Sequence, residues 1–160
     1  MSIQTGDSLP AGSFKTMDDG QIRVVSTDEL FGGKTVVLFG VPGAFTPTCN
    51  DAHMPGYMVN ADALREKGVD TVACMAVNDV FVMGAWGRAN DTGDYIQLLA
   101  DGNGDYAQAL GLTVDLSGFG MGQRVKRFAL VAKDGEVTYL GVEPGGEVTV
   151  SGADAVLEHL

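Results

Sequence analysis

The sequence predicts an α/β fold, in which a central mixed sheet is flanked by helices on both faces within a single domain, residues 1–160. Apolar runs of strand length alternate with segments that carry helix start and stop signals, a pattern typical of parallel βαβ units. Turn signals mark two hairpins, which add antiparallel strands. The length of 160 residues suits one hydrophobic core, and no linker or second domain is indicated.

The first third of the chain is predicted to contain a hairpin and a buried strand. Asp19-Gly20 is a hairpin-turn sequence with apolar residues after it. Residues 27–30 are expected to form a short capped turn. Residues 35–41 form a continuous apolar run rich in β-branched side chains, which indicates a strand buried on both faces.

A helix is predicted to begin soon after that strand. Thr46 and Pro47 combine a capping side chain with a proline suited to the first helical turn. We expect Pro55 to break or kink the segment that follows, because proline removes a backbone donor. Residues 57–67 are then expected to form a helix that ends at Gly68.

The remaining elements continue the alternation of strands and helices. Further strands are predicted at residues 69–77, 95–100, 128–132 and 136–140, and helices at residues 79–88, 105–110 and 152–160. Asp134-Gly135 joins the last two strands as a hairpin turn, and residues 118–122 form a glycine-rich loop. This order fits a thioredoxin-like sandwich.

The acidic composition argues against certain classes of binding partner. Ten Lys and Arg residues stand against 21 Asp and Glu, a net charge of −11 at neutral pH. An acidic surface repels phosphate groups, so we expect neither nucleic acid nor an anionic membrane as a partner. No apolar run approaches a membrane span of about 20 residues, and no secretion signal is recognised. The expected location is therefore the cytoplasm, with both thiols reduced at rest.

Cys49 is the first candidate for chemistry, because it lies at the predicted helix start. A thiolate at this place gains from unpaired backbone N–H groups and from the positive end of the helix dipole. The alternative is a small, buried, apolar side chain, the usual fate of a free cysteine. The placement after a strand, next to threonines, favours function.

His53 follows four residues later and leaves three interpretations open. It can pair with Cys49, it can join Cys49 as a metal ligand, or it can stand behind the site and hold the loop. A structural zinc site needs four ligands, and only Cys74 and His159 remain among the other cysteines and histidines. We therefore expect no metal, and nothing in the sequence indicates a cofactor. Asp101 begins a segment similar to a calcium loop, but it lacks the required glycine and glutamate and is expected to be a turn.

The sequence around Cys49 and His53 resembles that of a known family. The segment PGAFTPTC at residues 42–49, followed by His53, resembles the active-site stretch of peroxiredoxins, whose core pattern P-x-x-x-T-x-x-C corresponds to Pro42, Thr46 and Cys49. The details are most similar to the type 5 (type II) branch. Other similar stretches are residues 73–79, 99–104 and 124–128, and the resemblance runs from about residue 6 to residue 160.

The resemblance implies a thiol peroxidase that reduces hydrogen peroxide and organic hydroperoxides through a sulfenic acid on Cys49. It implies that the Thr46 hydroxyl contacts the thiolate or the peroxide, and that Pro42 shields the pocket from water. It also implies that Arg124 holds the thiolate and polarises the peroxide, work that suits a permanently charged guanidinium. Arg127 is the rival arginine, and we interpret it as a solvated charge that precedes a strand.

The sequence does not identify the thiol that reduces the oxidised Cys49. Some type 5 members carry a resolving cysteine near the C-terminus, but the matching stretch here, residues 147–151, has none. Cys74 lies in a predicted buried strand and is expected to pack in the core. An external thiol is therefore expected: glutathione, glutaredoxin or thioredoxin. Two alternatives remain open, a general thiol–disulfide oxidoreductase, which would normally carry C-x-x-C, and a redox-sensing or binding protein that signals through oxidation of Cys49.

The predicted helix after residue 78 has more apolar residues than one buried stripe needs. Phe81, Met83 and Trp86 belong to this helix, and Phe45 lies in the active-site loop. An exposed surplus would suit a partner surface, and type 5 relatives commonly form homodimers there. We therefore expect a homodimer, with the alternative that all four side chains serve the core.

Overall fold

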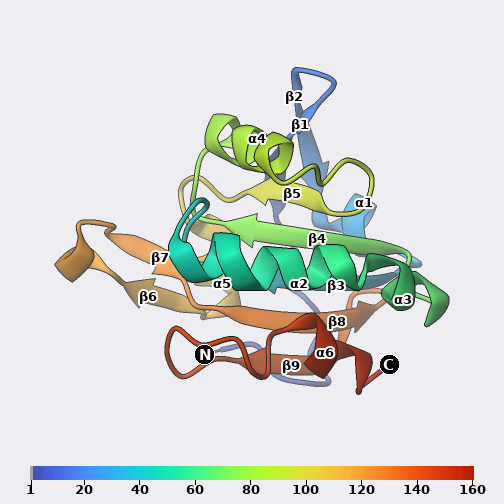
Figure 1. Cartoon of the computed structure of the whole chain (residues 1–160). Helices are drawn as coiled ribbons and strands as arrows, with labels where there is room; N and C mark the ends of the chain where they lie inside the picture. Colours follow the sequence, from blue (N-terminus) through green and yellow to red (C-terminus); the bar gives the residue numbers. More distant parts are fainter. Residues whose placement is uncertain (1) are drawn as a thin grey trace.

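The computed structural model describes residues 2–160 and has a central seven-stranded sheet with helices on both faces (Figure 1). The strand order is β2-β1-β5-β4-β3-β8-β9, and the strands of this sheet are β1 (Ser13–Asp18), β2 (Gln21–Ser26), β3 (Thr35–Gly40), β4 (Thr71–Ala76), β5 (Gln97–Ala100), β8 (Phe128–Lys133) and β9 (Glu136–Val142). Strands β3, β4 and β5 are parallel, and the outer pairs are antiparallel. The predicted mixed α/β sheet is confirmed.

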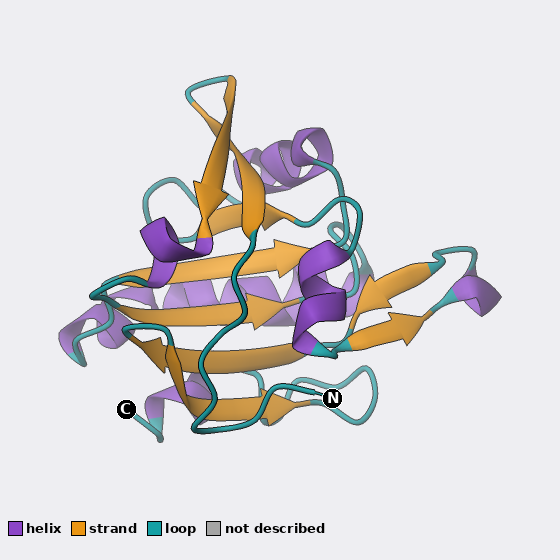
Figure 2. Ribbon diagram, turned by 180° about the vertical axis from the view of Figure 1, so that it is seen from behind, coloured by secondary structure: helices purple, strands orange, loops and turns teal. Residues whose placement is uncertain are grey.

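The two faces of the sheet carry separate helices. Figure 1 shows one face covered by the helical segments η1 (Cys49–His53), α2 (Met54–Val59), α3 (Ala61–Glu66), α4 (Val80–Ala89) and α6 (Ala153–Leu157). Figure 2 shows α1 (Thr27–Phe31) and α5 (Asp105–Leu110) on the other face. In β3, Val37 and Phe39 join the core under the first set, while Val36 and Leu38 join the core under the second. This confirms that the run at residues 35–41 is buried on both sides.

A second, two-stranded sheet projects from the body of the molecule (Figures 1 and 2). It consists of β6 (Thr113–Asp115) and β7 (Gln123–Val125), with a short 3₁₀ helix η2 (Ser117–Phe119) near its tip. The sequence predicted only a glycine-rich loop here. Each strand has three residues, too few for a clear alternation of apolar and polar side chains.

Turn chemistry accounts for both predicted hairpins. Asp19-Gly20 and Asp134-Gly135 all have positive φ, as the tight turns that match strand twist require.

The Asp101 carboxylate accepts hydrogen bonds from the backbone N–H groups of Tyr106 and Ala107 at the start of α5, at 3.0 and 2.8 Å. The Asp101 carboxylate therefore satisfies two backbone donors of α5, and its carbonyl accepts from the N–H of Gly104 at 2.8 Å, which closes the predicted turn.

The helix that carries Cys49 differs from the prediction. The chain is helical from Pro47, and Pro55 lies in the first turn of α2. Of the expected break or kink at Pro55, the break is wrong, and the helix is instead deformed just before Pro55 as the π-helical turn η1. In that turn the N–H of Met54 bonds to the carbonyl of Cys49, five residues back. One extra residue in the turn accommodates a proline that cannot donate, so the helix continues.

No helix among residues 2–160 has the length and apolar character needed to cross a bilayer.

Candidate active site around Cys49

Cys49 lies in the first turn of the helix that begins at Pro47, at the carboxyl end of β3. The predicted position at a helix start is confirmed. The side chain is fully buried, in the same apolar cluster as Phe39 and Tyr57. Because the first backbone N–H groups of a helix have no intrahelical partner, this place favours a negatively charged sulfur.

Arg127 is the arginine in contact with the sulfur. Its Nη2 donates to Cys49 Sγ at 3.0 Å, and only 4% of the residue is exposed. The interpretation of Arg127 as a solvated charge is therefore wrong. Arg127 directly precedes β8, and the pairing of Phe128 with Gly40 places this end of β8 beside the end of β3, where the active-site loop begins. A buried guanidinium next to a thiol stabilises the thiolate.

Arg124 touches the active-site loop instead. It lies in β7, where its Nε donates to the Met121 carbonyl at 2.8 Å and its Nη1 donates to the Pro42 carbonyl at 3.1 Å. Among residues 2–160, the hydrogen bond from an arginine to Cys49 Sγ comes from Arg127 alone. The expectation that Arg124 holds the thiolate is thus corrected: Arg124 braces the loop in front of the sulfur.

The loop between β3 and Cys49 is closely packed. The Thr46 hydroxyl donates to the Gly43 carbonyl at 2.6 Å, which uses its proton and leaves its oxygen able to accept. A Cβ at Gly43 would lie 3.0 Å from Arg124 Nη1 and 3.2 Å from the terminal methyl of Met121, so glycine permits this close approach. Pro42 is half-buried at the rim. The roles of Thr46 and Pro42 toward a peroxide stay predictions.

His53 stands behind Arg127 and does not bond to the sulfur. Its Nδ1 lies 2.9 Å from Arg127 Nη1, and its Nε2 lies 2.8 Å from the Ser151 carbonyl oxygen. Burial, with the charge of Arg127 acting in the same direction, lowers the pKa of His53 to about 4. His53 could have paired with Cys49, bound a metal or held the loop from behind the site. The structure favours the last interpretation, with a neutral imidazole. Among residues 2–160, no three His, Cys, Asp or Glu side chains group as a metal site needs.

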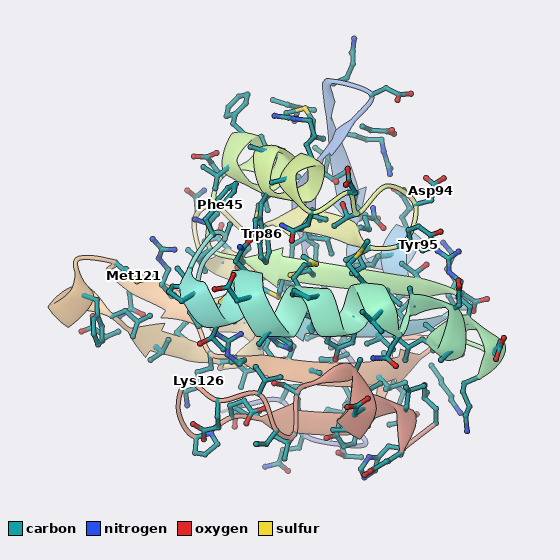
Figure 3. The ribbon with its side chains drawn as sticks, in the orientation of Figure 1. Phe45, Trp86, Asp94, Tyr95, Met121 and Lys126 are labelled. Atoms are coloured by element: carbon teal, nitrogen blue, oxygen red, sulfur yellow. The ribbon has the colours of Figure 1, made fainter. Side chains whose placement is uncertain are left out.

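The aromatic residues near the site divide between core and surface. Figure 3 shows Phe45 and Trp86 beside each other where α4 approaches the active-site loop, with Met121 on the neighbouring hairpin. Trp86 is buried, and its Nε1 donates to Asn50 Oδ1 at 2.8 Å; Met83 is buried as well. Phe45 and Phe81 are 52% and 65% exposed. Two of the four apolar residues proposed for a partner surface, Met83 and Trp86, therefore belong to the core.

Cys74 lies in the middle of β4, between Phe39 of β3 and Leu98 of β5 in register. It is fully buried, as predicted. Burial raises the pKa of the Cys74 thiol well above its ordinary value, and the nearby Cys49 adds to the effect. Both cysteines are free thiols.

Comparisons with known proteins show which family this chain resembles in sequence. The sequence model described as Redoxin matches residues 4–157. Peroxiredoxin-2B of Arabidopsis thaliana is 47% identical over 159 residues, covering 99% of this chain and 98% of the relative. The hybrid peroxiredoxin hyPrx5 of Haemophilus influenzae is 37% identical over 163 residues and covers 100% of this chain, which matches 67% of that longer protein.

Solved structures give the same result. Reduced Prx3 from Vibrio vulnificus in complex with hydrogen peroxide superposes with a TM-score of 0.93 at 46% identity, covering 98% of both chains. Peroxiredoxin 5 from Alvinella pompejana superposes with a TM-score of 0.86 at 33% identity, covering 98% of this chain and 97% of the other. With a buried thiol held by an arginine at a helix start, on a thioredoxin-like sheet, this chain belongs to the redoxin family as a peroxiredoxin of the type 5 (type II) branch, a thiol-dependent peroxidase.

Proposed function

We propose that the enzyme works with one cysteine, Cys49, and that an external thiol restores it. The observation that carries this proposal is the 3.0 Å contact from Arg127 Nη2 to Cys49 Sγ; among residues 2–160, no arginine or lysine makes such a contact with Cys74. Residues 147–151, where some relatives of this branch carry a resolving cysteine, contain none. Cys74 is fully buried in β4, and burial raises the pKa of its thiol well above the ordinary value, so Cys74 is a poor resolving nucleophile.

The first step is a displacement at oxygen. The Cys49 thiolate attacks one peroxide oxygen, an S–O bond forms, and the O–O bond breaks. Sulfur is oxidised to sulfenic acid, and the departing hydroxide or alkoxide takes a proton to leave as water or alcohol. Negative charge moves from sulfur to the leaving oxygen, and the Arg127 guanidinium stabilises it. Its Nε–H is buried and has no protein partner among residues 2–160, so a donor remains for a bound oxygen.

The second step is reduction by an external thiol. A thiolate attacks the sulfenic sulfur and releases water, and a second thiol then resolves the mixed disulfide. Because Cys49 is fully buried, a reductant reaches the sulfur only after the first helical turn opens. Glutathione, glutaredoxin and thioredoxin all supply the required chemistry, and peroxide consumption with each of them side by side identifies the reductant.

One experiment tests the one-cysteine mechanism directly. After one equivalent of peroxide, mass spectrometry with a sulfenic-acid trap should find a single adduct on Cys49. The Cys74→Ala variant should give the same adduct in the same yield. An intramolecular disulfide between Cys49 and Cys74 in the wild type, absent from the variant, would contradict the proposal.

We also propose that the protein is a homodimer through the exposed phenyl groups of Phe45 and Phe81. Two-fold dimers use one patch twice. Phe45 lies in the active-site loop and Phe81 in the first turn of α4, and both residues have more than half of their surface open to solvent. Phe81→Arg should give a monomer with an intact fold, because an unpaired charge is costly in an apolar contact. Sedimentation of both proteins decides this, and a wild type that is monomeric at micromolar concentration would contradict it.

A further inference from the structure

Arg127 is held from behind by a closed ring of hydrogen bonds. Its Nη1 lies 2.9 Å from His53 Nδ1, and His53 Nε2 lies 2.8 Å from the Ser151 carbonyl oxygen. The backbone N–H and hydroxyl of Ser151 both donate to the Glu143 carboxylate, at 2.8 and 2.6 Å. The backbone N–H of Glu143 then donates to the Arg127 carbonyl at 2.9 Å, which closes the ring.

The partners of His53 fix its protons. A guanidinium can only donate, so Nδ1 must offer its lone pair to Arg127. A carbonyl can only accept, so Nε2 must carry the hydrogen that points at Ser151. The imidazole is therefore neutral with one defined tautomer. With its lone pair occupied by Arg127, His53 is not available as the base for the Cys49 thiol.

Glu143 is buried and has no arginine or lysine partner among residues 2–160. Only 4% of it is exposed, and it accepts two further hydrogen bonds from the N–H and hydroxyl of Thr149, both at 2.7 Å. Burial works to raise the pKa of this carboxyl, but the hydrogen bonds from Ser151 and Thr149 outweigh burial and lower it. The carboxylate thus stays charged and fixes the segment that carries the Ser151 carbonyl.

We propose that Glu143 and His53 are positioning residues for peroxide reduction, and that the ring through Ser151 aims the Arg127 guanidinium at Cys49 Sγ. Neither residue touches the sulfur. His53 fixes one terminal nitrogen of the guanidinium, so that the other faces the thiolate at 3.0 Å. Tyr57 packs against the His53 ring and donates to the same Ser151 carbonyl at 2.7 Å, which further fixes the acceptor.

Two substitutions at His53 separate its two contacts. The amide of His53→Asn ends near the position of Nδ1, so it keeps an acceptor for Arg127. The amide of His53→Gln ends near the position of Nε2, so it keeps the contact to Ser151 and loses the one to Arg127. We expect the second-order rate with peroxide to fall roughly tenfold to a hundredfold in His53→Gln, since a misplaced catalytic group has an effect of this size, and by less in His53→Asn. Equal rates in wild type and His53→Gln would overturn the proposal.

A double-mutant cycle distinguishes positioning from a general effect on structure. In an Arg127→Ala background there is no guanidinium to aim, so adding His53→Gln should change the peroxide rate by less than about twofold. Alkylation of Cys49 by iodoacetamide at pH 7 should slow in His53→Gln alone and should not slow further in the double variant. Effects that multiply independently would overturn the proposal.

Glu143 is tested against Glu147, an exposed glutamate four residues away with no side-chain hydrogen bond among the described residues. Glu143→Ala should lower both the peroxide rate and the rate of Cys49 alkylation at pH 7. Glu143→Gln should recover part of both rates because it keeps an acceptor oxygen, and Glu147→Gln should match the wild type. Thermal unfolding is measured in parallel. If Glu143→Ala does not fold, the comparison of Glu143→Gln with Glu147→Gln decides. A folded Glu143 variant of lowered stability, with unchanged rates of peroxide reduction and of alkylation, would show a merely structural role.

Discussion

Cys49 and Cys74 differ in their surroundings rather than in their burial. Both side chains are fully covered, and both belong to the same apolar cluster. Cys49 lies in the first turn of a helix with a guanidinium nitrogen 3.0 Å from its sulfur. Cys74 lies mid-strand, and within the described part of the chain its thiol has a single long polar contact, 4.0 Å to the Met75 carbonyl. Burial alone keeps a thiol protonated and inert, so the reactive one needs a fixed positive partner.

The largest expected effect separates the two thiols directly. Cys49→Ser should abolish peroxide reduction, because serine cannot form the sulfenic acid. Cys74→Ala should keep activity within about twofold and lose only about 1–2 kcal/mol of stability from the smaller core side chain. Peroxide consumption and urea unfolding on both variants measure these outcomes. Equal inactivity of the two variants would mean that Cys74 takes part in the reaction.

Removing the positive partner should make Cys49 more like Cys74. Arg127→Ala should lower the second-order rate with peroxide by about 10²–10³-fold, or roughly 2–4 kcal/mol, the usual loss for one aimed donor. Stopped-flow measurement of peroxide consumption under single-turnover conditions tests this. A wild-type rate in the variant would show that the contact at 3.0 Å is not used in the reaction.

The buried imidazole of His53, behind Arg127, should also affect the stability of the protein in acid. The pKa of His53 is about 4 in the folded protein and near its ordinary value of 6.5 when unfolded. Between these pH values the unfolded chain binds more protons, so stability falls as the pH is lowered from 6.5 to 4, by about 3 kcal/mol in all.

A matched variant isolates this contribution. His53→Asn cannot titrate in that range. As the pH falls from 7 to 4.5, the free energy of unfolding of the wild type should therefore decrease by more than that of the variant. Urea unfolding at both pH values measures it. A difference that stays constant with pH would contradict the linkage.

The smallest effect is expected at Arg124, which braces the loop without reaching the sulfur. Arg124→Ala should reduce the peroxide rate by less than about tenfold and should cost about 1–2 kcal/mol of stability, from two lost hydrogen bonds to backbone carbonyls. The same rate and unfolding measurements apply. A larger rate defect than in Arg127→Ala would reverse the order of the two arginines.

The sequence allowed most of the sheet to be predicted, because continuous apolar runs and Asp-Gly turns act locally. It also placed Cys49 at a helix start. It could not choose between Arg124 and Arg127, because the choice depends on which strand lies beside β3. The pairing of Gly40 with Phe128 carries Arg127 to the sulfur, and this contact spans 78 residues of sequence. The ring through Glu143 and Ser151 was missed for the same reason, since it joins a loop near the C-terminus to the helix of Cys49.

The π-helical turn sets the phase of the helix that follows it. One residue of an α-helix corresponds to about 100° of rotation about the helix axis. The single extra residue within Cys49–His53 therefore turns the sulfur by about that angle relative to the apolar stripe of α2, which stays on the sheet. Deleting one residue from this turn would keep the stripe in place and carry the sulfur away from Arg127, around the side of the helix. The distance between thiol and guanidinium is thus set by a count of residues as well as by their identity.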